Sequence, residues 1–309
     1  DNEIVVYGRN DTKEVVRRSI SAGEVKKIPG LNGDAIKVVQ ALPGVGRAEF
    51  GAGAVRIRGA PTWDSRFYFD GVQIPLLYHF GGIKSIISSD ALSSIDVYPG
   101  GAGVKYGNSI AGSIEITGRS ADTKRVQGFA DISLFDVTLQ AEGPVGTKGS
   151  ILAFARRSYI GDILGYMTRS GTLDLPFTTV PYYYDYNVRA DINISPSQNL
   201  FFTLLGSKDE LSLIAPAVSG GSPSVDDMID RMKQMLGFNM VIIGWNKEFS
   251  PNFKNSLRAS IVHGVGYGTY FGFAKWDMNY WQYSLRNEAV WRLLDNISIT
   301  KLQAGYDYS

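Results

Sequence analysis

The sequence predicts a mainly β protein in which a compact α+β domain precedes the long strands of a transmembrane antiparallel β-barrel. Two observations predict this architecture. Between Ala54 and Ile116, short β-prone runs alternate with glycine turns, which suits a small domain with a limited core. From about Arg125 onward, the runs are longer and alternate between apolar and polar residues, which suits strands that face two different environments.

The overall composition narrows the class of protein. The 309 residues are 44% apolar, which is enough to bury a substantial core. Lys and Arg number 31 against 30 Asp and Glu, so the chain lacks the basic excess that nucleic-acid binding requires. The absence of cysteine excludes disulfides and thiolate metal sites, and it fits a protein of the cell envelope.

The long strands predicted in the second part of the chain are the reason to expect a membrane protein. No run approaches the roughly 20 apolar residues of a membrane helix, but a barrel strand needs only about 9–11 residues of alternating polarity. The clearest strand runs from Asp185 to Ile194, with Asp, Asn and Arg on one face and Tyr, Val, Ala and Ile on the other. Val137 to Glu142 and Leu257 to Ile261 follow the same pattern, and we expect about nine such strands in all.

Short turns alternate with long connections, as in barrels that have tight turns at one rim and long loops at the other. In a soluble sandwich, long loops confined to one side would be exceptional. The expected short turns are Gly146–Gly149, Ser195–Gln198, Ser250–Phe253 and Leu294–Asn296, and the expected long connections are Ile160–Tyr184, Asp209–Leu236 and Gly266–Met278. Aromatic residues near strand ends suit the girdles of a barrel: Tyr182, Tyr183, Tyr184, Trp245, Trp276, Trp281 and Trp291.

In the first part, four strands and two short helices are expected. A capping box at Ser21–Glu24 predicts the start of one helix, and a second should run from about Asp34 and end before Pro43. The glycine-rich loops indicate tight turns and not phosphate cradles, because no Gly-Lys-Ser/Thr follows them. The four expected strands are 54–59, 66–72, 92–98 and 110–116.

Several motifs stand in the order and spacing of a known family. They are Leu42-Pro43-Gly44-Val45, Ile57-Arg58-Gly59, Phe69-Asp70-Gly71-Val72, Ile95-Asp96-Val97-Tyr98-Pro99-Gly100 and the stretch from Tyr106-Gly107 to Ile116. This order resembles the plug domain of TonB-dependent outer-membrane transporters. The resemblance implies a TonB-box-like segment at 1–8, a plug at 9–119 that lies inside the barrel, and the N-terminal part of that barrel at 120–309.

The resemblance also implies that the barrel is incomplete here, because the plugged transporters have 22 strands. About nine strands left open would expose an edge to lipid, which a membrane does not tolerate. We therefore expect the N-terminal part of a longer chain, or a chain completed by another component.

The function implied by the resemblance is TonB-dependent active transport of a scarce substrate, such as a ferric siderophore, cobalamin or a glycan. The expected location is the outer membrane of a Gram-negative bacterium, with the plug N-terminus facing the periplasm. The implied partners are TonB of the inner membrane, outer-membrane lipid and lipopolysaccharide, and the small-molecule substrate. The alternative is a plug-barrel protein that serves as a structural or docking component of an envelope complex.

No catalytic residues and no cofactor are expected, since neither a nucleophile elbow nor metal-ligand spacing is present. With only two histidines in the chain, a multi-histidine metal or haem site at His79 is not expected. The resemblance identifies Glu3, Ile4, Val5, Val6 and Tyr7 as a TonB box, an extended segment that adds a strand to its partner. A plain edge strand is the alternative for this segment.

Two further sets of residues are expected to have roles. Substrate should meet the outward turns of the plug, and two interpretations stay open for the aromatic residues there: ligand binding, or simple filling of space against the wall. The candidate side chains are Arg47, Glu49, Phe50, Trp63, Tyr78, His79 and Phe80.

Arg58 should pair with a barrel carboxylate, because an unpaired charge in a buried interface costs several kcal/mol. Glu142, Asp191 and Glu288 are the candidate partners, with the part of the barrel beyond this chain as the other source. Two residues depart from the family pattern, Pro99 in place of an arginine and Glu115 in place of an asparagine.

Overall fold

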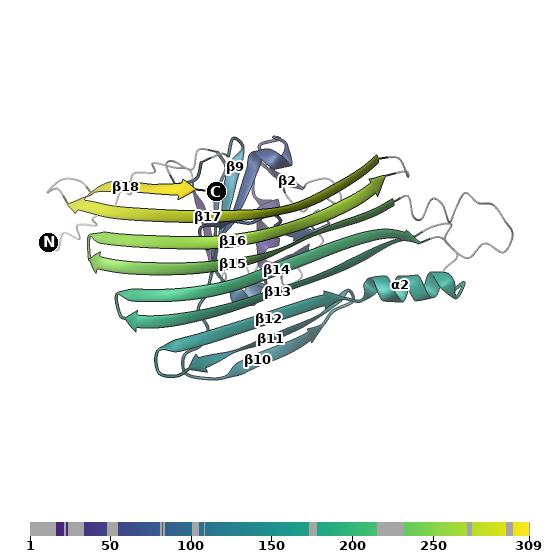
Figure 1. Ribbon diagram of the computed structural model, residues 1–309, viewed down its shortest axis with the longest axis horizontal. Helices are drawn as coiled ribbons and strands as arrows, with labels where there is room; N and C mark the ends of the chain where they lie inside the picture. The colour runs from purple at the N-terminus through teal and green to yellow at the C-terminus, as the bar shows by residue number, and fades with distance from the viewer. Residues whose placement is uncertain are drawn as a thin grey trace, which may run out of the picture.

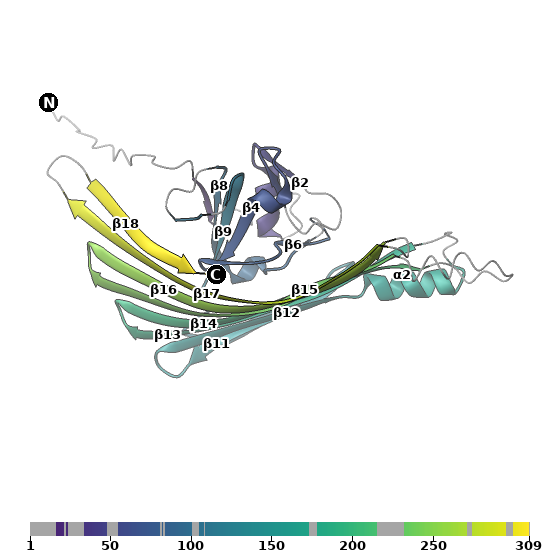
Figure 2. The same ribbon diagram turned by 45° about the horizontal axis from the view of Figure 1, so that its top comes forward.

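A computed structural model gives the fold in two parts, a small N-terminal domain and a long curved sheet that we call the wall (Figure 1). Figure 2 shows the N-terminal domain lying against the concave face of the wall. The structure describes residues 17–21, 23, 34–47, 55–80, 82, 84–100, 105–107, 109–172, 178–214, 232–270, 274–294 and 299–308.

The N-terminal domain is built on a five-stranded sheet with the order β1-β8-β9-β4-β5. β4 and β9 run parallel, and the other neighbours are antiparallel. Two small hairpins, β2–β3 and β6–β7, flank this sheet. The strands are β1 (Arg18–Ser21), β2 (Val45–Arg47), β3 (Val55–Ile57), β4 (Ser65–Phe69), β5 (Val72–Gln73), β6 (Tyr78–His79), β7 (Lys84–Ser85), β8 (Leu92–Tyr98) and β9 (Gly112–Gly118).

Four of these strands, β3, β4, β8 and β9, lie where the sequence predicts them. The helix predicted from Asp34 is present as the 3-10 helix η1 (Ala35–Ala41), and the Asp34 side chain caps it by accepting from the Ile36 amide. The helix predicted to begin near Ser21 lies largely outside the described residues, and Ser21 itself ends β1, a strand that the sequence does not predict. Two further 3-10 turns are η2 (Thr62–Asp64) and η3 (Ser89–Ala91).

The wall is a nine-stranded antiparallel sheet in which each strand pairs with the next along the chain. This confirms the expected number of strands and their antiparallel arrangement. The strands are β10 (Gln127–Ile132), β11 (Asp136–Val145), β12 (Gly149–Ser158), β13 (Thr178–Ser195), β14 (Gln198–Ile214), β15 (Met232–Ser250), β16 (Phe253–Tyr270), β17 (Ala274–Leu294) and β18 (Ile299–Tyr308).

The short turns after β11, β13 and β15 fall where they are predicted, at one end of the wall. The long connections are shorter than predicted, because the strands continue into them. β13 begins at Thr178, β14 continues to Ile214, and β16 and β17 occupy most of 266–278. The helix α2 (Ile160–Arg169), which the sequence does not predict, lies at the opposite end from the short turns (Figure 1).

The inner face of the wall and the N-terminal domain share one hydrophobic core. Ile36, Leu77 and Ile114 of the domain belong to the same buried cluster as Phe238 and Ile242 of the wall. The outward face of the wall is also apolar but exposed, as the alternation predicts; it includes Leu139, Ile192, Phe202, Ile243 and Ile261. Within the described residues, no helix has the length and apolar character needed to cross a membrane.

Candidate functional site

The hairpin β6–β7 carries charged side chains from the N-terminal domain to the wall. Tyr78 and His79 are neighbours in a strand, so their side chains point to opposite faces. Tyr78 points into the domain core, where its hydroxyl donates to the Ile36 carbonyl at 2.7 Å. His79 points to the wall and is fully buried there.

His79 lies between two carboxylates of the wall. Its Nε2 is 2.8 Å from Asp185 Oδ2 in β13, and its Nδ1 contacts Asp209 Oδ1 in β14. Each ring nitrogen lies within hydrogen-bonding distance of a carboxylate, and the imidazolium is the form of the ring that donates at both nitrogens. Burial by itself lowers the pKa of His79, but Asp209 and Asp185 outweigh it and raise the pKa from 6.5 to about 9.

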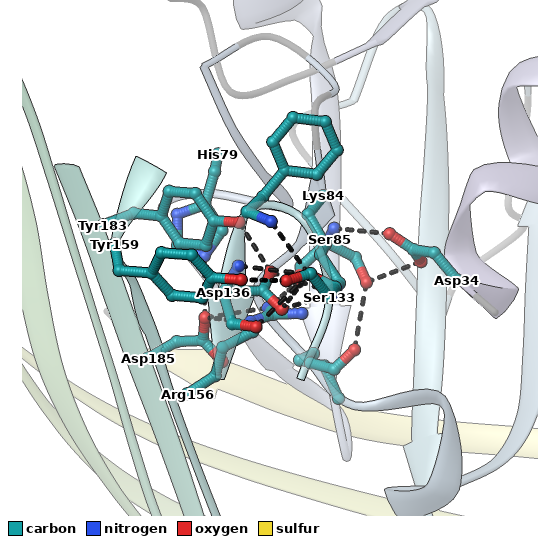
Figure 3. Close-up of polar contacts among 12 residues, drawn as sticks. Asp34, His79, Lys84, Ser85, Ser133, Asp136, Arg156, Tyr159, Tyr183 and Asp185 are labelled. Atoms are coloured by element: carbon teal, nitrogen blue, oxygen red, sulfur yellow. Dashed lines mark hydrogen bonds and ion pairs between the residues drawn. The ribbon is translucent and has the colours of Figure 1, made fainter. Parts of the chain in front are cut away.

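Neighbouring ion pairs extend this contact into a buried group that we call the His79 cluster (Figure 3). Arg156 binds Asp185 at 2.8 and 2.9 Å and also donates to the Ser85 carbonyl. Lys84 binds both oxygens of Asp136 at 3.0 and 3.1 Å. Tyr183 stacks on His79 and donates to Asp136. The cluster comprises His79, Lys84, Asp136, Arg156, Tyr183, Asp185 and Asp209.

A second contact, of opposite polarity, holds the turn between β4 and β5. Here the N-terminal domain supplies the carboxylate, Asp70, and β13 supplies Arg189, which donates to it at 2.6 Å. Asp191 binds the same guanidinium at 2.8 and 3.0 Å. Asp70 has a left-handed φ of 50° and also accepts from the Gly118 amide, so the turn is fixed from both sides.

A third contact lies where the chain leaves the N-terminal domain for the wall. Arg119 donates to both oxygens of Glu142 in β11, with each distance 2.6 Å. Glu142 also accepts from the Asp122 amide and from Gln127. Three charged contacts thus attach the small domain to the wall, and each of them couples residues far apart in sequence.

The comparisons with known proteins identify the small domain. Residues 11–113 match the family described as TonB-dependent Receptor Plug Domain. This chain carries a TonB-dependent receptor plug domain. We therefore call the N-terminal domain the plug from here on.

The solved structures most similar to this chain include plug-barrel receptors. The ferric enterobactin receptor PfeA of Pseudomonas aeruginosa, as a G324V mutant, superposes with a TM-score of 0.64 at 15% identity, over 99% of this chain and 50% of that chain. The siderophore receptor PirA of Acinetobacter baumannii gives 0.66 at 15% identity, over 98% and 49%. The unliganded ferric citrate transporter FecA gives 0.66 at 16% identity, over 95% and 47%.

At these identities the likeness establishes a shared plug-and-barrel fold. The chain spans about half the length of the structures that it matches. No curated protein matches the chain in sequence.

The residues predicted to bind substrate are not brought together as one surface. Tyr78 and His79 of the plug have no exposed surface, so neither side chain can reach a ligand in this conformation. Phe80 is mostly buried and borders a small cavity, whereas Trp63 is 72% exposed. The structure describes the backbone of Arg47 in β2 but not its side chain, and Glu49 and Phe50 lie outside the described residues. The predicted TonB box, Glu3 to Tyr7, also lies outside them.

Arg58 of the plug does not pair with any of its three candidate partners. Its side chain is exposed and lies over Gly100, where a methyl group on that glycine would approach Arg58 Nη1 to 2.6 Å. The three candidate carboxylates are bound by other arginines: Glu142 by Arg119, Asp191 by Arg189 and Glu288 by Arg286. An ion pair of Arg58 with a residue beyond this chain stays a prediction.

Sequence reasoning missed most residues of the His79 cluster. The sequence predicts Asp209 in a long connection, although it lies in β14 and faces the plug. It places Asp185 correctly on the polar face of a strand but indicates no partner for it. The available signal was the charge on that face, because Asp185, Arg189 and Asp191 point inward and need partners there.

Proposed function

We propose that this chain forms the plug and the first nine wall strands of a TonB-dependent active transporter of the outer membrane. The observation that carries the proposal is the position of the plug, which matches the receptor family and lies on the concave face of the wall. The exposed apolar outer face of the same wall suits contact with lipid. In the proposal, residues 9–119 close the barrel and residues 120–309 begin it.

Transport in this proposal needs a movable plug and an external source of energy. TonB would add a strand to the segment from Glu3 to Tyr7, on the periplasmic side, and pull on the plug. Because the energy comes from the inner membrane, the chain needs no catalytic residue for this function.

The chemistry of the plug–wall contacts supports a plug that can be moved. Ion pairs such as Asp70–Arg189 are directional, and both partners can be hydrated after separation, in contrast to the apolar cluster that the plug also shares with the wall. They fix the plug in one orientation, since the positive hairpin carrying His79 meets carboxylates while the negative turn at Asp70 meets Arg189. We therefore assign to these contacts the role of holding the closed plug in place.

A ferric chelate is the substrate class that we propose first. Three of the most similar solved structures are named as receptors or transporters of ferric enterobactin, of a siderophore and of ferric citrate. Of the candidate side chains, we retain the exposed Trp63 first, with Phe80 beside a small cavity and Arg47, Glu49 and Phe50 as candidates from the sequence.

Uptake by living cells tests this function. The complete protein would be expressed in Gram-negative cells that lack their own chelate receptors, with and without TonB, and supplied with radioactive iron as a panel of chelates. We expect one chelate class to bind in both strains and to enter only the cells that have TonB. Localisation is checked by membrane fractionation. Binding or assembly into a complex without any TonB-dependent uptake would favour the docking role instead.

A further inference from the structure

The β6–β7 hairpin is a small element whose place on the wall depends on a few side chains. Each of its strands has two residues, and they are joined by the pairs Tyr78–Ser85 and His79–Lys84. Phe80, which follows His79, has a left-handed φ of 46°, and its amide donates to Asp209 Oδ2 at 3.2 Å. Asp209 therefore binds both the ring of His79 and the backbone next to it.

The titratable groups near His79 come from four strands of the wall and from the plug. The wall contributes Asp136 from β11, Arg156 from β12, Asp185 and Tyr183 from β13, and Asp209 from β14. The plug contributes Lys84 from β7, and Asp34, which binds the Ser85 amide and hydroxyl.

The balance of charge at this interface depends on the proton of His79. With the ring protonated, the cations His79, Lys84 and Arg156 face three wall carboxylates, and all six side chains lie in one buried or nearly buried group. Loss of the proton leaves two cations for three carboxylates. It also leaves one ring nitrogen facing a carboxylate as an acceptor, without a hydrogen to share.

We propose that His79 is a titratable latch, whose imidazolium holds the β6–β7 hairpin of the plug on β13 and β14 and whose deprotonation frees the hairpin from the wall. This role needs no substrate and no TonB, so it does not depend on the proposed function. When the latch opens, Asp209 also loses its place beside the Phe80 amide, so the small cavity lined by Phe80, Asp209 and Leu236 changes shape.

The direction of the pH dependence follows from the two protonation equilibria. The free imidazole has a pKa of 6.5, and the two carboxylates raise the pKa of His79 to about 9 once burial has been overcome. A raised pKa means that the protonated ring stabilises the attached state fully below about pH 6.5 and that this stabilisation is lost as the pH rises through about 9. The latch is therefore closed at neutral pH and opens in alkali.

Amide hydrogen exchange on the complete protein in detergent micelles tests the proposal. Exchange of the Phe80 amide, which donates to Asp209 of the wall, would be followed from pH 6 to pH 10 and expressed relative to the intrinsic rate at each pH. We expect protection to be constant below about pH 6.5, to fall progressively as the pH rises from there to about 9, by tenfold or more in all, and to level off above that pH. The amides of β9 serve as an internal control and should show no such fall.

Three variants separate the latch from other titrations. In His79→Gln, which cannot carry the charge, protection of the hairpin should be low at every pH and show no transition. In Asp209→Asn the transition should move to lower pH, because one of the two charges that stabilise the imidazolium is removed. The matched control is His263→Gln. His263 is the second histidine of the chain, lies in β16 and stacks on Trp281 of β17 at the outer face of the wall, which is the face turned away from the plug.

The outcomes decide between the latch and a purely structural histidine. A transition in His79→Gln like that of the wild type would overturn the proposal. Undiminished protection of the wild-type hairpin up to pH 10 would also overturn it. If His79→Gln does not fold, Asp209→Asn decides alone, and an unchanged transition there contradicts the latch.

Discussion

Arg119 and Glu142 join the exit of the plug to the second wall strand through two parallel hydrogen bonds of 2.6 Å each. The planar guanidinium matches the carboxylate atom for atom, which is the strongest geometry open to such a pair. Glu142 is nearly buried whereas Arg119 is partly exposed, so the pair is only partly screened by solvent. This ion pair therefore holds the end of the plug in place against β11 of the wall.

Glu142→Gln should loosen this junction, because the amide keeps the shape of the carboxylate but loses the charge. We expect the free energy of local opening at the Arg119 amide, which donates to the Ala91 carbonyl, to fall by about 2 kcal/mol. Hydrogen exchange measures it. The matched control is Glu248→Gln, which removes an exposed pair with Lys254 and should change stability by less than about 0.5 kcal/mol. Equal effects of the two substitutions would contradict this interpretation.

Asp70 combines a charge with a left-handed backbone, and two substitutions separate these roles. Asp70→Asn loses the charge that faces Arg189 but suits the φ of 50° and can still accept from the Gly118 amide. Asp70→Ala loses the charge, the tolerance of a left-handed φ and the acceptor for the Gly118 amide. We expect a cost of about 1–2 kcal/mol for Asn and about 3 kcal/mol or more for Ala. Hydrogen exchange of the Gly118 amide measures the free energy lost in each variant. A larger loss for Asp70→Asn than for Asp70→Ala would refute the assignment.

Glu115 stands where the family pattern has asparagine, and the structure supplies it with a cation. Lys105 Nζ lies 2.7 Å from Glu115 Oε2, and the Tyr106 hydroxyl donates to the same oxygen. Burial raises the pKa of the Glu115 carboxyl above its ordinary value, and Lys105 opposes part of this rise. Lys105 thus neutralises the charge of an acidic residue that is buried inside the plug.

Lys105→Met should leave Glu115 buried without its cation and destabilise the plug at neutral pH. A carboxyl with a raised pKa favours the folded state at low pH, and this contribution is lost as the pH rises through the folded-state value. The loss of stability should therefore shrink on acidification. Denaturation of Lys105→Met at pH 4 and pH 7 measures the difference, and adding Glu115→Gln should restore stability at pH 7. A defect of equal size at both pH values, or no rescue, would show that Lys105 acts through packing alone.

The number of wall strands and the place of the turns after β11, β13 and β15 could be predicted from sequence, because sustained alternation of apolar and polar residues is typical of a strand with two different faces. The turn predicted at Leu294–Asn296 lies largely outside the described residues. Asp185 to Ile194 is a strand in both the prediction and the structure. The predicted strand ends are wrong where glycines gather. Gly266 and Gly268 are typical of loops, yet they lie in β16, where a methyl group on either would collide with the Trp276 ring of β17. Each glycine makes room for the aromatic side chain of the neighbouring strand. The alternation of residues along one strand does not indicate which side chains lie opposite in the next.

The candidate site was harder to predict, because its contacts join distant residues. The sequence favours His79 as a surface residue able to meet substrate, but Asp185 and Asp209 lie 106 and 130 residues further on and bury it. It also predicts that Arg58 pairs with Glu142, Asp191 or Glu288, each of which has an arginine close to it in sequence or at the plug exit. Charge on the inner face of the strands predicts that ion pairs exist, but only the register of the strands determines which residues form them.

In the proposed transporter the energy for transport enters through the N-terminal segment, and uptake by a Val5→Pro variant tests this most directly. Proline removes one backbone donor, so strand addition to TonB should fail while the plug and the substrate site stay intact. Val5→Ala is the matched control, since it keeps the donor. In intact cells with equal surface expression, we expect Val5→Pro to bind the substrate as the wild type does and to take up none of it, while Val5→Ala transports normally. Wild-type uptake by Val5→Pro would contradict the claim.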